Sequence, residues 1–426
     1  MNEKTEAFDV IILLRHDELE KLRYVLPYLK QNINADMYRV ITDDITCVSG
    51  YAEPTVDFID ENIFLRRGDV QNIISDITDG DQKSYARAGW YLQQFVKLSY
   101  ARVCKKKFYM LWDGDTIPLK PVEMFFAGKP VFHMKTEYHQ SYFTVMQKLV
   151  NGLGKLEKRS YIAEHMLMNT EIVQELLDEI ESNNKIEGLS FYEKILHSIE
   201  KSEIQASGFS EFETYGNFCE FRHSDVYLKK DWKSLRNAGE YFSLSQLSQA
   251  DVKWLSTEYD AASFEKNSIL TPLHDLYSSG EIQGKYTFCG FCELIMQHDQ
   301  LQKNIYIAAV FRRYFEKWKN KKLILYGTGI IADAIVRYNP DFQFAGILDQ
   351  KQDKERFHNY SVLNWEQAEM MEIEIIVIAA SQIGIQAVSK RIGNRCREDG
   401  IRLYDCYGIN RLDPDVINSG EEKNSD

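Results

Sequence analysis

The sequence has no long hydrophobic run and no excess of positive charge, and each absence excludes a class of protein. No stretch approaches the ~18 uninterrupted apolar residues of a membrane-spanning helix, and the opening MNEKTEAFDV lacks the apolar core of a secretory signal. The 51 Lys and Arg residues are outnumbered by 64 Asp and Glu residues, giving a net charge of −13. A protein that coats nucleic acid needs a basic face. We therefore expect a cytoplasmic protein with no transmembrane segment and no nucleic-acid partner.

Cysteine is also scarce. The seven cysteines are odd in number and scattered along the chain, which favours free thiols over a disulfide framework. Cys289 and Cys292 form a single C-x-x-C. A zinc site would need a second pair, and a redox site would need a thioredoxin-like context. We expect these two cysteines to pack rather than to carry chemistry.

What the sequence does contain is an ordinary globular composition. Hydrophobic residues make up 44% and charged residues 27% of the 426 residues, which is enough to bury the cores of two or three domains. Aromatic residues reach 13%, mostly Tyr and Phe. Aromatic rings line carbohydrate and nucleotide pockets, but any single ring is first expected in a core.

The central stretch is Lys105–Pro121, KKKFYMLWDGDTIPLKP. Its apolar run Phe108–Trp112 predicts a buried strand that delivers Asp113-Gly114-Asp115 to a loop. Two carboxylates separated only by glycine can turn toward one point. Oxygen ligands of this kind suit Mg²⁺ or Mn²⁺, alongside substrate phosphates and water.

Three interpretations of Asp-Gly-Asp remain open from these residues alone. It is a solvated turn after a strand, since Asp and Gly are turn residues. Alternatively it is a phosphatase-type aspartyl nucleophile, although Thr116 follows Asp113 one residue too early for that motif. The third interpretation is the Asp-x-Asp metal clamp of nucleotide-sugar glycosyltransferases.

The amino-terminal part predicts a parallel α/β sheet. Phe8–Leu14 and Met37–Ile41 read as strands, and between them a helix starting near Asp17 carries leucines at helical spacing. Ligands of such sheets bind at the carboxyl ends of the strands. Arg15 follows the first strand directly, where it would meet a nucleotide or simply begin a helix in solvent.

A predicted helix, Ala86–Cys104, precedes the central strand. Trp90 and Leu98 share one of its faces, and Gln94 or Lys97 could reach a bound phosphate or sugar. A partly buried polar pair is the alternative interpretation.

The segment Phe209–Phe218 predicts a strand or extended loop with one polar face. In a strand, Glu211 and Glu213 would point to the same side. An acceptor hydroxyl that attacks with inversion needs a carboxylate or a histidine as base, and these glutamates are the candidates. His223 is either a third metal ligand or a surface histidine.

Four segments occur in a characteristic order: GWYLQQFVKLSYA, YMLWDGDTIPLKPV, YIAEHMLMN and GFSEFETYGNF. In this order they resemble a family of bacterial glycosyltransferase-like proteins with the GT-A fold, long catalogued as a domain of unknown function. The resemblance covers roughly residues 8–265. It implies a hexosyltransferase-type enzyme with a divalent metal, Mn or Mg, acting in surface polysaccharide or lipopolysaccharide assembly. The implied partners are a nucleotide-sugar donor and a saccharide or lipid-linked saccharide acceptor.

The same resemblance assigns residues to roles. Asp113 and Asp115, with the intervening Gly114, would hold the metal and the donor diphosphate. The donor side would be lined by Trp90, Gln94 and Lys97. The acceptor or the reacting sugar carbon would be faced by Glu164, His165, Glu211 and Glu213.

Residues 321–413 begin a second α/β unit. A strand ending at Tyr326 is followed by Gly327-Thr328-Gly329 and a helix, and a second strand ends at Asp349. This is the Rossmann dinucleotide fingerprint with Ala332 in its third position, and it resembles small Rossmann-like modules appended to sugar-modifying enzymes. Gly327, Gly329 and Asp349 are candidate nucleotide contacts. Packing or homo-oligomerisation is the alternative role of this unit.

We therefore expect an α/β protein with a GT-A-like domain over 1–300, a connecting helix over 301–320, a Rossmann-like domain over 321–413 and a disordered tail over 414–426. The function predicted is metal-dependent glycosyl transfer. One alternative is a nucleotide-sugar oxidoreductase or epimerase, although no Tyr-x-x-x-Lys follows Tyr326 in the last domain. Another is a non-catalytic nucleotide-sugar binder. The donor, the acceptor and the stereochemical course are not encoded in any motif.

Overall fold

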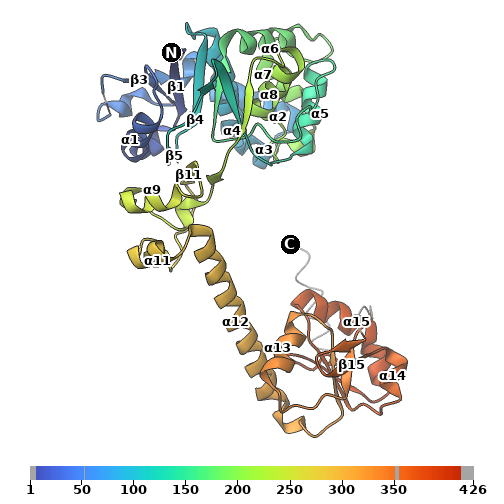
Figure 1. The fold of residues 1–426 in the computed structure, drawn as a ribbon. Helices are drawn as coiled ribbons and strands as arrows, with labels where there is room; N and C mark the ends of the chain where they lie inside the picture. Colours follow the sequence, from blue (N-terminus) through green and yellow to red (C-terminus); the bar gives the residue numbers. More distant parts are fainter. Residues whose placement is uncertain (1–5, 52, 351–354, 414–426) are drawn as a thin grey trace. The chain divides into compact units, whose positions relative to one another are not determined.

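The computed structural model describes residues 6–51, 53–350 and 355–413 and divides into two units, Met1–Phe288 and Cys289–Asp426 (Figure 1). The predicted tail, 414–426, lies outside the described residues. The boundary between the units falls at the first residue of a long helix, α12 (Phe288–Phe315). This helix covers only part of the connecting segment expected over 301–320 and begins well before it.

A five-stranded sheet forms the centre of the first unit. In spatial order its strands are β3 (Val56–Asp60), β2 (Tyr38–Thr42), β1 (Phe8–Leu13), β4 (Phe108–Asp113) and β8 (His165–Asn169). The first four are parallel and β8 runs antiparallel to β4. The register sets Leu13 beside Asp113, and Trp112 beside His165. The carboxyl ends of β1 and β4 therefore meet at one edge.

Helices pack on this sheet. They are α1 (Leu22–Asn32), α2 (Arg67–Thr78), α3 (Gln82–Ala86), α4 (Ala88–Ser99), α5 (Gln140–Leu149), α6 (Thr170–Ser182), α7 (Phe191–Ser198) and α8 (Glu211–Arg222). Figure 1 shows α1 to the left of the sheet and α2, α4, α6, α7 and α8 to its right. One core joins alternate strand residues such as Ile11 and Leu111 to Phe95 of α4 and Phe218 of α8. Burial of both sheet faces explains why the strands read as continuous apolar runs.

The first predicted helix forms, but not from its first residue. Leu22, Leu26 and Leu29 are buried along α1, as their spacing predicts. The preceding turn, His16–Lys21, is a 3₁₀ helix that buries Leu19. The α/β class predicted for this part is confirmed.

The predicted strand or extended loop over Phe209–Phe218 is wrong, because the chain forms helix α8 there. Ser210 caps the helix, its Oγ accepting a hydrogen bond from the backbone N of Glu213 at 3.3 Å. Glu211 and Glu213 stand in the first turn, where acidic side chains favour a helix. All residues from Glu211 to Cys219 are buried, so no polar face marks the helical period.

The first unit contains two further small sheets. One contains β10 (Ser234–Leu235), β11 (Ala261–Ser263) and β5 (Thr116–Pro118), and the other contains β6 (Phe125–Phe126), β7 (Lys129–Met134) and β9 (Leu228–Asp231). Short helices α9 (Gln249–Leu255), α10 (His274–Tyr277) and α11 (Gly280–Lys285) follow. Because β5 starts immediately after Asp115, its pairing with β11 holds the far side of the Asp-Gly-Asp turn.

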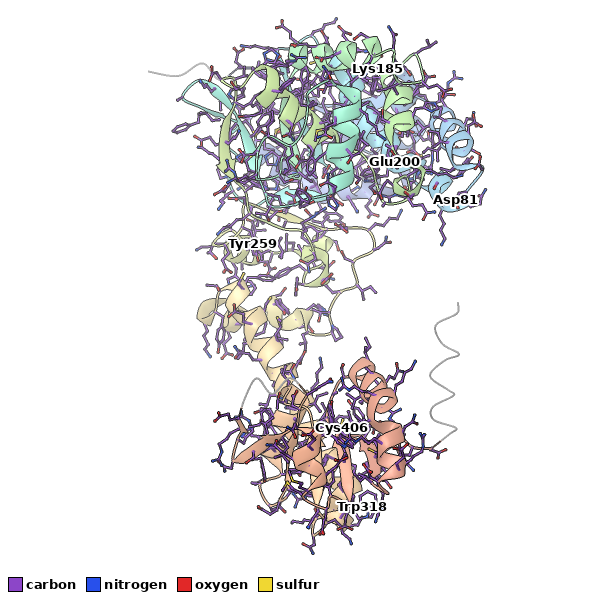
Figure 2. The ribbon with its side chains drawn as sticks, turned by 90° about the vertical axis from the view of Figure 1, so that its right-hand side faces the viewer. Asp81, Lys185, Glu200, Tyr259, Trp318 and Cys406 are labelled. Carbon is purple, nitrogen blue, oxygen red and sulfur yellow. The ribbon has the colours of Figure 1, made fainter. Side chains whose placement is uncertain are left out.

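The second unit is built on a six-stranded sheet. Its spatial order is β14 (Arg356–Phe357), β15 (Tyr360–Leu363), β13 (Gly346–Leu348), β12 (Leu323–Tyr326), β16 (Ile375–Ile378) and β17 (Arg402–Asp405). All but β14 are parallel. The helices are α13 (Ile330–Tyr338), α14 (Trp365–Glu369) and α15 (Gln382–Glu398). Figure 2 labels two residues of this unit, Cys406 in the core and Trp318 packed against it.

Among the described residues, no helix combines the length and apolarity that spanning a bilayer requires. Cys47, Cys104, Cys219, Cys396 and Cys406 are free thiols, as expected.

Candidate active site

A pocket of about 740 Å³ opens at the carboxyl ends of β1 and β4. Its walls come from the start of α8, the pocket face of α4, the loop before β8 and the loop after β11. The residues predicted for the site that line it are Trp90, Gln94, Lys97, Asp113, Gly114, Asp115, Glu164 and Glu211. Segments far apart in the sequence thus meet where parallel sheets bind ligands.

The Asp113-Gly114-Asp115 turn is fixed by close packing. A Cβ added at Gly114 would lie 2.5 Å from Cγ of Leu14, so only glycine fits against that leucine. The indole Nε1 of Trp112 donates to the Thr116 carbonyl at 2.8 Å and closes the turn. On the other side, the Asp113 backbone N donates to the Glu164 carbonyl at 2.8 Å. The two carboxylates are therefore presented by a rigid loop.

Lys97 is the electrostatic centre of the pocket. Its Nζ lies 3.2 Å from Oδ1 of Asp113 and 2.9 Å from Oε1 of Glu211. Burial would lower the pKa of Lys97, but the two carboxylates outweigh it and raise that pKa. The ammonium therefore stays charged, and it holds α4, β4 and α8 together at the pocket floor.

Asp113 has an unusual acidity. Burial at the pocket floor raises its pKa to about 6, and although Lys97 opposes the shift, the charges of Asp115 and Glu211 add to it. The side chain still exposes 40% of its surface. An additional cation that enters the pocket would stabilise the ionised form of Asp113, which the neighbouring acids destabilise.

Gln94 carries an unpartnered donor. Its Oε1 accepts from the backbone N of Glu211 at 3.0 Å, which orients the amide. Its Nε2 is buried and has no hydrogen-bond partner among the described residues. Because buried polar groups are nearly always paired, this amide nitrogen on the pocket wall is a candidate donor to a ligand oxygen.

Glu164 is fully engaged by protein groups. Its Oε1 accepts from Lys135 Nζ at 2.8 Å and from Ser234 Oγ at 2.6 Å, and its Oε2 accepts from Trp232 Nε1 at 3.0 Å. Burial alone would raise the pKa of Glu164, but Lys135 and these hydrogen bonds lower it. Glu164 therefore stays ionised and positions Lys135 on the pocket wall.

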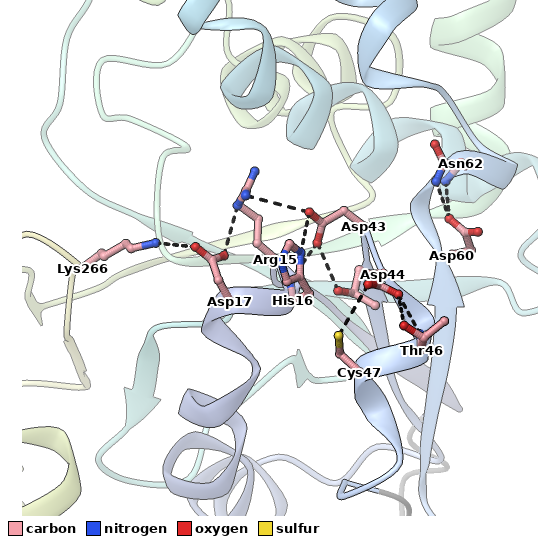
Figure 3. Close-up of polar contacts among 11 residues, drawn as sticks. Arg15, His16, Asp17, Asp43, Asp44, Thr46, Cys47, Asp60, Asn62 and Lys266 are labelled. Atoms are coloured by element: carbon pink, nitrogen blue, oxygen red, sulfur yellow. Dashed lines mark hydrogen bonds and ion pairs between the residues drawn. The ribbon is translucent and has the colours of Figure 1, made fainter.

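Arg15 stands at the same sheet edge, beside the pocket rather than among its lining residues. Figure 3 shows it between Asp17 and Asp43. Its Nε donates to Asp17 Oδ1 at 3.2 Å, and Asp17 also accepts from Lys266 Nζ at 2.8 Å. His16 binds Asp43 through its backbone N at 2.7 Å and its ring Nδ1 at 3.0 Å. This network orders the chain after β1 and β2.

His165 and Glu213 lie behind the pocket wall, which corrects their predicted catalytic placement. His165 is stacked on Trp112 and its Nε2 is 2.7 Å from Nδ1 of His133. Burial, with the neighbouring His133, lowers its pKa well below the usual value, so it is neutral. Glu213 accepts from Ser160 Oγ at 2.6 Å and from the Tyr161 backbone N at 3.1 Å. Helical rather than extended backbone separates it from Glu211, which faces the pocket.

His223 is also placed away from the predicted metal site. It ends α8 and pairs with Glu175 at 2.7 Å, far along the helix from Glu211. Within the described ranges, no group of three or more His, Cys, Asp or Glu side chains is arranged to hold a metal. Two carboxylates on a rigid turn nonetheless fit Mg²⁺ or Mn²⁺, which bind proteins through one or two carboxylates and complete their shell with water and substrate phosphates.

Several lining cations were not predicted from the sequence. They are Lys21, Arg87, Lys135, Arg236 and Lys266. They come from five separate segments, so no local spacing marks them. Only Arg87 could have been noticed, because it lies in the predicted helix Ala86–Cys104 that carries Trp90.

The residues predicted for the second unit meet at a different pocket. Gly327, Gly329 and Asp349 line a cavity of about 960 Å³ formed by residues of that unit.

A model of a protein family of unknown function, DUF6492, matches residues 12–260 of this chain, which is more than half of its length. No curated protein matches the sequence.

Three solved structures that resemble the chain are glycosyltransferases by their descriptions. Mouse xyloside xylosyltransferase 1 in its apo form is 12% identical with a TM-score of 0.31, covering 62% of this chain and 100% of that one. The glycosyltransferase GlyE of Streptococcus pneumoniae TIGR4 is 10% identical with a TM-score of 0.29, covering 94% and 91%. The galactosyltransferase LgtC in complex with donor and acceptor sugar analogs is 9% identical with a TM-score of 0.33, covering 66% and 96%.

Proposed function

This chain belongs to the DUF6492 family of unknown function, and we propose that it is a metal-dependent glycosyltransferase that moves a sugar from a nucleotide-sugar donor to a saccharide acceptor. The observation that carries the proposal is the rigid Asp113-Gly114-Asp115 turn at the floor of a pocket rich in cations. Six Lys and Arg side chains line this pocket together with seven Asp and Glu side chains. An anionic substrate would be met by these cations and by a divalent ion held between the acids.

The leaving group sets what the pocket must do. Breaking a sugar–diphosphate bond develops negative charge on the departing phosphate, which fixed cations stabilise. Asp113 and Asp115 would hold a divalent ion, whose charge neutralises the diphosphate. Lys97 keeps Asp113 oriented before substrate arrives, at 3.2 Å. The ammonium of Lys97 could then interact with a phosphate oxygen as well as with the carboxylates.

The amide of Gln94 has a separate role. Its Oε1 is held by the start of α8, and its Nε2 is free to donate. A sugar hydroxyl or a phosphate oxygen is the acceptor that this buried donor lacks. Gln94 would therefore orient the donor substrate, with Trp90 on the same helix providing an apolar surface for a sugar ring or base.

Of the three residues predicted to be catalytic, Glu211 is the one that lines the pocket. Its carboxylate forms an ion pair with Lys97 at 2.9 Å. It can accept a proton from an attacking hydroxyl only as Lys97 turns toward the leaving phosphate. If transfer instead retains the configuration of the sugar, no such base is needed, and Glu211 would only position the substrate. We extend the proposal to saccharide or lipid-linked saccharide acceptors in bacterial surface polysaccharide synthesis.

The test is a transfer assay with a panel of nucleotide sugars, with and without Mn²⁺. The wild-type chain should release nucleoside diphosphate in the presence of metal and acceptor. Asp113→Asn combined with Asp115→Asn should lower the rate by about a thousandfold or more, since metal charge stabilisation supplies several kcal/mol. Asp231→Asn is the matched control, because that acid is 82% exposed and should retain full activity. Full turnover in metal-free buffer, or in the double variant, overturns the proposal.

A further inference from the structure

The sheet of the second unit changes direction at its centre. From β12 the chain passes through α13 to β13 on one side, and it later returns to β16 on the other side of β12. The loops that follow β12 and β16 therefore leave in opposite directions. In open parallel sheets, this reversal creates a crevice at the carboxyl ends of the two strands.

The 960 Å³ cavity occupies this crevice. Its lining comes from the ends of three neighbouring strands, at residues 326–331, 349–350 and 379–381, and is completed by side chains of α12, Arg391 of α15, and Tyr407. The size matches pockets that enclose ligands of drug or nucleotide size. None of the transfer chemistry at the first pocket uses these residues.

The glycine loop brings backbone rather than side chains to the cavity. Gly327 has φ +115°, a conformation that other residues rarely adopt, and a Cβ there would lie 3.1 Å from the Ala379 carbonyl. Gly327 therefore lets the loops after β12 and β16 approach each other. At Gly329 the situation is reversed, since a Cβ would meet nothing within 4 Å. The backbone at Gly329 borders open space.

Charges of both signs face this space. The Arg391 guanidinium is held by the hydroxyl of Tyr326 and by Oε1 of Gln350, and Lys303 of α12 is the second lining cation. Directly after β13, Oδ2 of Asp349 accepts a hydrogen bond from Thr328 Oγ1 at 2.6 Å. A fixed guanidinium suits phosphate oxygens. An acid at the end of the second strand suits ribose hydroxyls.

We propose that this cavity binds the nucleoside diphosphate part of a ligand, with the ribose at Asp349 and the phosphates between Arg391 and the Gly327–Gly329 backbone. The binding is separate from sugar transfer. The ligand that carries this group is a free nucleoside diphosphate, a nucleotide sugar or a dinucleotide, because all three contain a nucleoside diphosphate.

The experiment is calorimetric titration of the full chain carrying Asp113→Asn and Asp115→Asn, so that transfer at the first pocket is disabled. The probes are ADP, UDP, UDP-glucose and NAD⁺, which separate the three sources. We expect at least one probe to bind at one site per chain. Gly329→Val should weaken it by roughly tenfold or more, because a Cβ at this position meets no protein atom within 4 Å and the side chain would occupy the space left for the ligand.

Arg391→Gln should weaken the same probe by roughly tenfold, as expected for a lost hydrogen-bonded charge. Arg395→Gln is its matched control: it lies one turn further along α15 and pairs with Glu369 at 2.7 Å instead of lining the cavity. Affinity should be unchanged in that variant. The inference is overturned if no probe binds at millimolar concentration, or if binding survives both Gly329→Val and Arg391→Gln. Neither result affects the transfer assay of the first pocket.

Discussion

The two pockets of this chain differ in how their residues are distributed along the sequence. The first gathers side chains from Leu13 to Asn267, and 13 of its 29 lining residues are charged. The second takes its loops from the ends of three adjacent strands, and it presents glycine backbone, tyrosines and small apolar residues with few charges. The first is thus assembled by long-range packing, whereas the second follows from a local strand–turn–helix pattern.

This difference has a consequence for how each pocket responds to change. The first pocket depends on ion pairs and close contacts that join distant segments, such as Lys97 with Asp113 and Glu211. A single substitution there disturbs several elements at once. The second pocket has an open position, Gly329, where an added Cβ meets no protein atom within 4 Å.

The largest stability effect should come from Gly114→Ala. The new Cβ would overlap Leu14, whose Cγ lies 2.5 Å away, so we expect the free energy of unfolding of the first unit to fall by about 3 kcal/mol. Hydrogen exchange measured separately over both units checks this, since the second unit has its own core and should be unaffected. Gly68→Ala is the control, because nothing lies within 4 Å of its Cβ. An unchanged first unit would show that the turn is not held by this contact.

An intermediate effect should distinguish Glu213 from Glu211. Glu213→Gln removes the charge that binds Ser160 and the Tyr161 backbone, and should cost about 2 kcal/mol of stability without changing the transfer rate of the folded protein. Glu211→Gln should do the reverse, lowering transfer while costing less stability. Denaturant unfolding and steady-state kinetics on both variants provide the measurements. Equal loss of transfer in the two variants would contradict their different placement.

The smallest effect concerns pH. The pKa of Asp113 is raised to about 6, so the folded protein holds this proton more tightly than the unfolded chain does. The associated stability is present at low pH and is lost as pH rises through about 6. A metal competes with the same proton, and its affinity should rise roughly tenfold per pH unit below 6 and level off above it.

Thermal shift with Mn²⁺ between pH 5 and 8 measures this dependence. Asp113→Asn should abolish the inflection near pH 6 while the protein remains folded. A wild-type metal affinity that is flat across this range would show that Asp113 is not a ligand.

Much of the fold could be predicted because the spacing of apolar residues within one strand or one helix is set by residues close together in the sequence. The strand ending at Trp112 and the helix that carries Leu22, Leu26 and Leu29 form where apolar spacing predicts them. The segment Phe209–Phe218 could not be recognised as helical, since it is buried on all sides and alternating glutamates imitate a strand. Its cap, Ser210, was the local signal that the pattern concealed.

The candidate site was predictable in part for the same reason. Asp113 and Asp115 end an apolar strand, and Gln94 and Lys97 precede it on a helix, so their proximity follows from neighbouring elements. Lys135, Arg236 and Lys266 have no such relation to the turn. His165 was misplaced because a sequence motif does not show on which side of a strand a side chain points.

The sequence by itself determined the alternation of strands and helices, the glycines at both turns and the two acids that follow the central strand, because these depend on the residues within one element. The tertiary structure alone decided which distant charges join them in the pocket. Lys97 sits between Asp113 and Glu211, residues distant from each other in the chain, and their charges interact strongly only because folding removes the water that would otherwise screen them.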